Sequence, residues 1–145
     1  MELYECINFL LETTRNSVHA YFKGKLAPFD VTPIQYALLK CLWKTDMQPP
    51  SQLAQTLKID ASTTTGVVER LERKSLVERV YSKTDRRSVH VCLTPSGAAL
   101  QKGVEAAILE ANKEVLSDFS DEEAILFKKM CILARDTATR KKDAT

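Results

Sequence analysis

The stretch SQLAQTLKIDASTTTGVVERLERKS, residues 51–75, decides the fold of this chain. Apolar residues at helical spacing predict a short helix over 51–57 and a longer one from Ala61 to about Lys74. Between them, the carboxylate of Asp60 can accept hydrogen bonds from the free N–H groups of a new helical turn. Two helices joined by a turn of three or four residues are typical of a helix-turn-helix.

The longer helix has two unlike faces. One face is apolar and is expected to pack on a core, whereas the other is small near its N-terminus and basic near its C-terminus. Hydroxyls and methyl groups can contact base edges in a major groove, and Gly66 would let the backbone approach closely. The alternative is an ordinary amphipathic surface helix. The residues expected to contact DNA are Ser62, Thr63, Thr65, Gly66, Arg70 and Arg73.

A hairpin is expected directly after this helix. The runs 76–80 and 89–93 alternate apolar and polar residues, which predicts two half-buried strands. The polar connector 81–88 makes them a long-looped wing. Asp85 could hold the Arg87 guanidinium in a bidentate pair, and an arginine at a wing tip can enter a narrow minor groove. A basic loop by itself is usually only solvated. The expected wing contacts are Lys83, Asp85, Arg86 and Arg87.

The charge and composition of the chain limit the classes of function that we expect. The 145 residues carry a net charge of only +2, which does not by itself indicate nucleic-acid binding. Residues 49–93, however, carry eight Lys or Arg against five Asp or Glu. We find no nucleophile–base pair, no glycine-rich phosphate loop and no metal-ligand spacing, so we expect neither an enzyme nor a cofactor or metal ion. No signal peptide or membrane-length apolar run is visible, and we expect a cytoplasmic protein with reduced thiols.

The flanking segments predict further helices. The expected fold is mainly α: six helices and a β-hairpin wing, in one domain over 1–145. The first and the last two helices carry apolar stripes that a monomer of this size does not clearly need. The simpler alternative is that these stripes pack on the helix-turn-helix. We expect a homodimer, with dimerisation helices at 1–28 and 96–141 and a winged helix-turn-helix lobe at 31–95.

The stretch from Gln52 to Val77, followed by DRRSVHVCLTPSG at residues 85–97, resembles the MarR (multiple antibiotic resistance regulator) family. The family's wing signature is Asp-x-Arg, alternating aliphatic residues, then Leu-Thr and a glycine three residues after the Thr. The matching residues are Asp85, Arg87, Leu93, Thr94 and Gly97. Ser75 departs from the glycine that usually closes the recognition helix. The resemblance covers nearly the whole chain and implies a homodimer that reads a pseudo-palindromic operator in double-stranded DNA.

The resemblance also implies a signal that the regulator senses. Family members often bind small aromatic or phenolic acids between the dimerisation helices and the DNA-binding lobe. By position, such a cleft could be lined by Arg15, His19, Tyr21, Tyr36 and Trp43. The alternative places Tyr36 and Trp43 in the core and His19 on the surface.

Other family members oxidise a cysteine. Cys6 lies near the reactive position of the peroxide-sensing branch, but Asn8 aligns with that position. The branch's activating tyrosines align with Phe22 and Pro33, which have no hydroxyl. Cys41 and Cys131 fall on apolar stripes and are expected in the core.

The sequence therefore predicts a sequence-specific DNA-binding transcription regulator, acting as a homodimeric repressor that a small aromatic or phenolic effector releases from DNA. Two alternatives stay open: a redox-responsive regulator using Cys6, and a winged-helix module that binds proteins. No membrane partner is expected.

Overall fold

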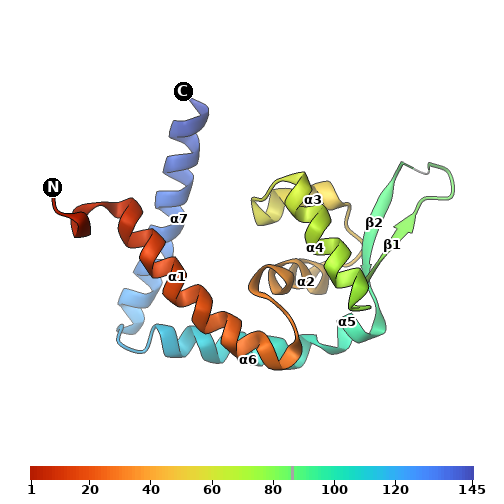
Figure 1. Ribbon diagram of the computed structural model, residues 1–145, viewed down its shortest axis with the longest axis horizontal. Helices are drawn as coiled ribbons and strands as arrows, with labels where there is room; N and C mark the ends of the chain where they lie inside the picture. The colour runs from red at the N-terminus through yellow and green to blue at the C-terminus, as the bar shows by residue number, and fades with distance from the viewer. Residues whose placement is uncertain (86) are drawn as a thin grey trace. The chain divides into compact units, whose positions relative to one another are not determined.

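The chain is mainly helical with one β-hairpin, in a computed structural model that describes residues 1–85 and 87–145 (Figure 1). It divides into two compact units, Met1–Leu109 and Glu110–Thr145. Arg86, a predicted DNA contact, lies outside the described residues. The elements are η1 (Leu3–Glu5), α1 (Ile7–Leu26), η2 (Ala27–Phe29), α2 (Pro33–Lys44), α3 (Pro50–Leu57), α4 (Ala61–Arg73), β1 (Val77–Tyr81), β2 (Val89–Leu93), α5 (Pro95–Ala99), α6 (Gln101–Val115) and α7 (Asp121–Asp143).

The described residues form seven α-helices, one more than predicted. The helix expected from Pro95 onward is interrupted at Leu100, which separates α5 from α6. Leu100 is partly buried against both apolar clusters of the first unit. The predicted fold class, mainly α with a hairpin wing, is confirmed.

Local side-chain caps explain where most of the helices begin. Thr32 and Gln35 form a reciprocal capping box at the start of α2, and Ser120 and Glu123 form another at the start of α7. Thr94 Oγ1 accepts a hydrogen bond from the Gly97 N–H at 3.0 Å. Each cap satisfies an N–H group that has no partner within its helix.

The core of the first unit lies beneath the helix-turn-helix. Its fully buried members come from α2, α3, α4 and the hairpin, so the two strands and three helices share one apolar cluster. A second cluster joins the end of α1 to α6. The largest side chains of the first cluster are Leu38, Leu39, Leu42, Leu53, Val67, Val68, Leu71 and Val91.

The hairpin begins one residue later than predicted and pairs in antiparallel register, with Val77 opposite Leu93. Gln48, in the connector between α2 and α3, forms an isolated bridge with Val91. Its backbone N–H donates to the Val91 carbonyl at 3.2 Å and its carbonyl accepts from the Val91 N–H at 2.8 Å. The connector between α2 and α3 therefore anchors the base of the wing.

Ser75 closes α4 in a left-handed conformation, with a φ of 58°. Its carbonyl accepts a hydrogen bond from Thr94 Oγ1 at 2.7 Å, and its N–H donates to the Glu72 carbonyl at 2.9 Å. A serine thus makes the turn that the family usually gives to glycine, at a cost of about 1 kcal/mol.

The second unit consists of the end of α6, a short turn and α7. Large apolar side chains of α7 are exposed, among them Ile125 at 69% and Leu133 at 55%. Cys131 is exposed as well, so the prediction that it lies in the core is wrong for the single chain. The apolar side chains of the stripe to which it belongs are exposed too. None of the described helices is long and apolar enough to cross a membrane.

Candidate nucleic-acid interface

The position of α4 is fixed from its first turn. Asp60 Oδ1 accepts a hydrogen bond from the Thr63 N–H at 2.6 Å, as predicted. Hydrogen bonds from Thr63 lower the pKa of the Asp60 carboxyl. Thr64 turns inward, where its Oγ1 donates to the Asp60 carbonyl at 2.8 Å. Together with Val67, Val68 and Leu71, it forms the buried face of the helix.

The opposite face of α4 is open. Ser62, Thr63, Thr65, Arg70 and Arg73 are exposed, and Gly66 is half-buried among them. A Cβ atom on Gly66 would meet only Arg70 Nη1, at 3.7 Å. The fold therefore does not require a glycine at this position, which leaves close approach of a ligand as a reason for it.

The wing carries the second part of the surface. Lys83, Asp85 and Arg87 are exposed in the connector between β1 and β2. Asp85 Oδ1 accepts a hydrogen bond from the Arg87 backbone N–H at 3.0 Å, and no ion pair joins it to the Arg87 guanidinium in the described part of the chain. The predicted bidentate pair is therefore wrong. An aspartate reaches the backbone two residues on more easily than a side chain there, and this leaves the guanidinium available.

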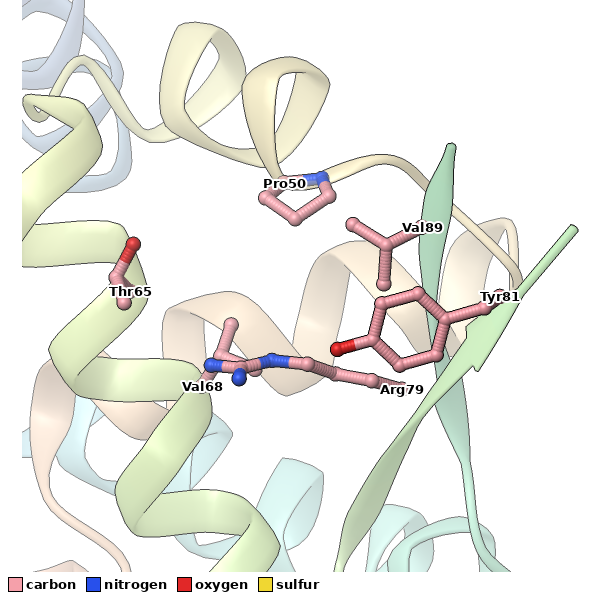
Figure 2. Close-up of a pocket in the computed structure, with 6 residues that line it drawn as sticks. All are labelled: Pro50, Thr65, Val68, Arg79, Tyr81 and Val89. Atoms are coloured by element: carbon pink, nitrogen blue, oxygen red, sulfur yellow. The ribbon is translucent and has the colours of Figure 1, made fainter. Parts of the chain in front are cut away.

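A hollow of about 220 Å³ separates α4 from the hairpin, lined by Pro50, Thr65, Val68, Arg79, Tyr81 and Val89. Figure 2 shows the Arg79 side chain extending from β1 toward α4, with the Tyr81 ring beside it. Arg79 Nε lies 3.2 Å from Glu72 Oε1, so this ion pair links β1 to α4. The surface thus continues from α4 to the wing.

Arg79 and Tyr81 were not among the predicted site residues. Alternation along β1 puts both on the same side as the buried Val77, which faces the core. That period-two pattern was the signal that could have placed them beside α4.

Comparison with known proteins agrees with this geometry. Residues 31–89 match the model of the MarR family. The regulator PecS of Dickeya dadantii is 32% identical over 117 residues, which are 81% of this chain and 68% of PecS. A probable transcriptional regulator from Pseudomonas aeruginosa is 34% identical, with a TM-score of 0.83 over 92% of this chain and 98% of that one. The chain belongs to the MarR family. It is therefore a DNA-binding transcription regulator and not an enzyme.

Two further proteins are similar to this chain. The homoprotocatechuate degradative operon repressor of Escherichia coli is 25% identical over 83% of this chain and 82% of its own length. A mutant MarR from E. coli complexed with operator DNA has a TM-score of 0.81 and 22% identity over 88% of this chain and 92% of that one. The similarity to this mutant MarR shows a shared fold alone.

The five residues proposed for a MarR-family effector cleft lie in two different settings. Arg15, His19 and Tyr21 are exposed on α1. Tyr36 and Trp43 are partly buried on α2, with their ring centroids 6.4 Å apart. Trp43 Nε1 donates to the Gly97 carbonyl at 2.9 Å, and burial raises the pKa of Tyr36. None of the five lines the hollow beside the hairpin or a second hollow between α2 and α3.

The cysteines give little support for thiol chemistry. Cys41 is half-buried and Cys92 is buried, and burial raises the pKa of both thiols, so fewer thiolates form at neutral pH. Cys6 is half-buried at the N-cap of α1. Cys41 packs against the core as predicted.

Proposed function

We propose that this MarR-family regulator is a repressor whose α4 enters the major groove while its wing contacts the neighbouring backbone or minor groove. One observation carries the proposal: the hollow of Figure 2 joins Thr65, on the exposed face of α4, to Arg79 and Tyr81 of the hairpin, whose connector carries the exposed Lys83 and Arg87. The proposed DNA contacts are Ser62, Thr63, Thr65, Gly66, Arg70, Arg73, Lys83, Asp85 and Arg87, with Arg86 added from the sequence. The name of the E. coli homoprotocatechuate degradative operon repressor supports the repressor role.

We also propose that the regulator acts as a homodimer. Monomeric proteins rarely expose large contiguous apolar patches, and both ends of this chain expose large apolar side chains. At the N-terminal end these are Leu3, Tyr4, Ile7, Leu10 and Leu11, and on α7 they are Ile125, Leu126, Phe127, Met130, Ile132 and Leu133. Helices within 1–28 and 96–141 would form the dimer, which leaves 31–95 as the lobe that reads DNA.

A small aromatic acid is the proposed effector. The support is the name of the homoprotocatechuate repressor and the adjacent rings of Tyr36 and Trp43. Arg15, His19 and Tyr21 would complete the cleft only once the dimer has formed, since they are exposed in the single chain.

Replacing Arg87 with alanine should weaken binding to every duplex, roughly tenfold near 0.1 M salt, because a cation at a DNA backbone or minor groove acts largely independently of sequence. The slope of log affinity against log salt should fall by about 0.9 for each subunit. Fluorescence anisotropy with operator and random duplexes across salt concentrations measures both. Lys102→Ala removes an exposed cation from α6 and should change neither. Equal behaviour of the two variants would remove Arg87 from the site.

Thr65→Ala should act on sequence preference instead. Its methyl and hydroxyl groups lie at the N-terminal end of the exposed face, where a helix contacts base edges. We expect the ratio of operator to random-duplex affinity to fall roughly fivefold, with the salt slope unchanged. Thr139→Ala is the matched control, because both hydroxyls donate to the carbonyl four residues earlier, at 2.9 Å and 3.0 Å. An unchanged ratio for Thr65→Ala would mean that this residue does not read bases.

A further inference from the structure

Lys74 follows directly after the last residue of α4 and would ordinarily be counted with Arg70 and Arg73 as a phosphate contact. Its side chain does not point into solvent as theirs do. The Nζ atom donates to the Asp30 carbonyl at 2.5 Å and to Gln35 Oε1 at 2.9 Å. It also lies 3.6 Å from Asp30 Oδ1, and only 27% of the side chain is exposed. Three oxygen atoms therefore surround this ammonium group.

These oxygen atoms belong to the connector between α1 and α2 and to the first turn of α2. Asp30 ends η2 in a left-handed conformation with a φ of 54°, and its N–H donates to the Ala27 carbonyl at 3.0 Å. Gln35 is 3% exposed, and its Oε1 also accepts from the Thr32 N–H at 3.2 Å. The side-chain amide that accepts the hydrogen bond from Lys74 is thus part of the capping box that starts α2.

We infer that Lys74 is a positioning residue for DNA reading: it fixes the C-terminal end of the recognition helix to the α1–α2 connector and does not contact DNA. Apart from the Glu72–Arg79 ion pair, which joins α4 to the hairpin, the remaining contacts of α4 are mostly apolar, through Val67, Val68 and Leu71. Apolar packing is non-directional and permits small rotations or slides of a helix. A charge-assisted hydrogen bond has a preferred direction and distance, so it fixes the register of the exposed face.

The inference rests on the proposed role of α4. It is tested by comparing substitutions at two neighbouring cations, Lys74 and Arg73. Lys74→Met should weaken operator binding roughly fivefold and leave random-duplex affinity and the salt slope unchanged, because base contacts need alignment and phosphate attraction does not. Arg73→Met should reduce both affinities and the salt slope. A fall in salt slope for Lys74→Met equal to that for Arg73→Met would overturn the inference, as would wild-type operator affinity. A wild type with no sequence preference would instead contradict the proposed function.

A second variant replaces Gln35, which accepts the hydrogen bond from Lys74. Gln35→Met cannot remove a phosphate contact, since Gln35 is buried, yet it should give the same selective loss of operator affinity. The double variant should lose less than the product of the two single losses, since both remove one interaction. Multiplicative losses would contradict the coupling. All variants are compared at a temperature where circular dichroism shows them folded.

A third measurement needs no DNA. In the free wild-type protein, an amine-acetylating reagent should modify Lys74 several-fold more slowly than the exposed Lys83 and Lys102, as measured by peptide mass spectrometry. Gln35→Met should raise the rate at Lys74 alone. Equal rates at the three lysines in the wild type would show that the ammonium group is not held.

Discussion

Gly97→Ala is expected to destabilise the protein by about 3 kcal/mol, the upper part of the usual range for inserting a methyl group into a packed site. A Cβ atom on Gly97 would lie 2.0 Å from the Leu76 carbonyl oxygen and 3.3 Å from Leu93 Cδ2. The first of these atoms is backbone and cannot rotate away. That oxygen also accepts the Thr94 N–H at 3.1 Å, so the methyl group would separate α5 from the junction of α4 and β1.

The measurement is thermal unfolding followed by circular dichroism, at equal protein concentrations because an oligomer's Tm depends on concentration. For a chain of this length, a loss of about 3 kcal/mol lowers Tm by roughly 10 °C. Ser96→Ala, at the exposed neighbouring position on α5, is the control and should leave Tm within about 2 °C of the wild type. An unchanged Tm for Gly97→Ala would show that this close approach is absent in solution.

Gly66→Ala is expected to give the opposite result for stability and a large loss of DNA affinity. Its methyl group has free space in the protein, so replacing a helical glycine should raise the free energy of unfolding by about 1 kcal/mol. Bound to DNA, the same methyl group would hold the helix away from the bases. We expect operator affinity to fall roughly tenfold, within the range of a lost base contact.

Gly24→Ala is the matched control for this pair of effects. Gly24 lies in α1, and a Cβ atom there would meet nothing within 4 Å. Both substitutions should raise or preserve Tm, whereas only Gly66→Ala should lower operator affinity. If Gly66→Ala binds the operator as the wild type does, the helix does not approach DNA at this residue.

The parts of the fold that depend on neighbouring residues were predictable from the sequence. Asp60 acts as a cap as expected, and Ser120 and Thr94 cap their own helices in the same way, because a cap involves only a side chain and a backbone group three residues away. The apolar period also identified the buried face of α4. Local chemistry therefore located α4 and the wing hairpin.

The features that were missed depend on contacts distant in sequence. Gln48 pairs with Val91, and Lys74 is bound by Asp30 and Gln35, across 43, 44 and 39 residues of chain. No local pattern distinguishes Lys74 from Arg73, since both are cations at the end of one helix. The interruption at Leu100 likewise follows from packing on two clusters and not from a glycine or proline at that position.

The two alternative functions, a redox-responsive regulator and a winged-helix module that binds proteins, depend on different residues. A redox-responsive regulator would depend on the thiol of Cys6, since burial raises the pKa of Cys41 and Cys92. A winged-helix module that binds proteins would not require Arg87 or Gly66 for duplex affinity. The variants above therefore separate DNA reading from protein binding.

The most direct test of the central claim is selection of bound duplexes from a random DNA pool with the wild-type protein, followed by footprinting of the enriched sequence. A homodimer reading DNA through α4 and the wing should enrich an inverted repeat with half-site centres about one helical turn apart, roughly 10 bp, and protect both half-sites. Enrichment of a single unrepeated half-site would contradict the dimer. Recovery of no preferred sequence would contradict the assignment of α4 as the element that reads DNA.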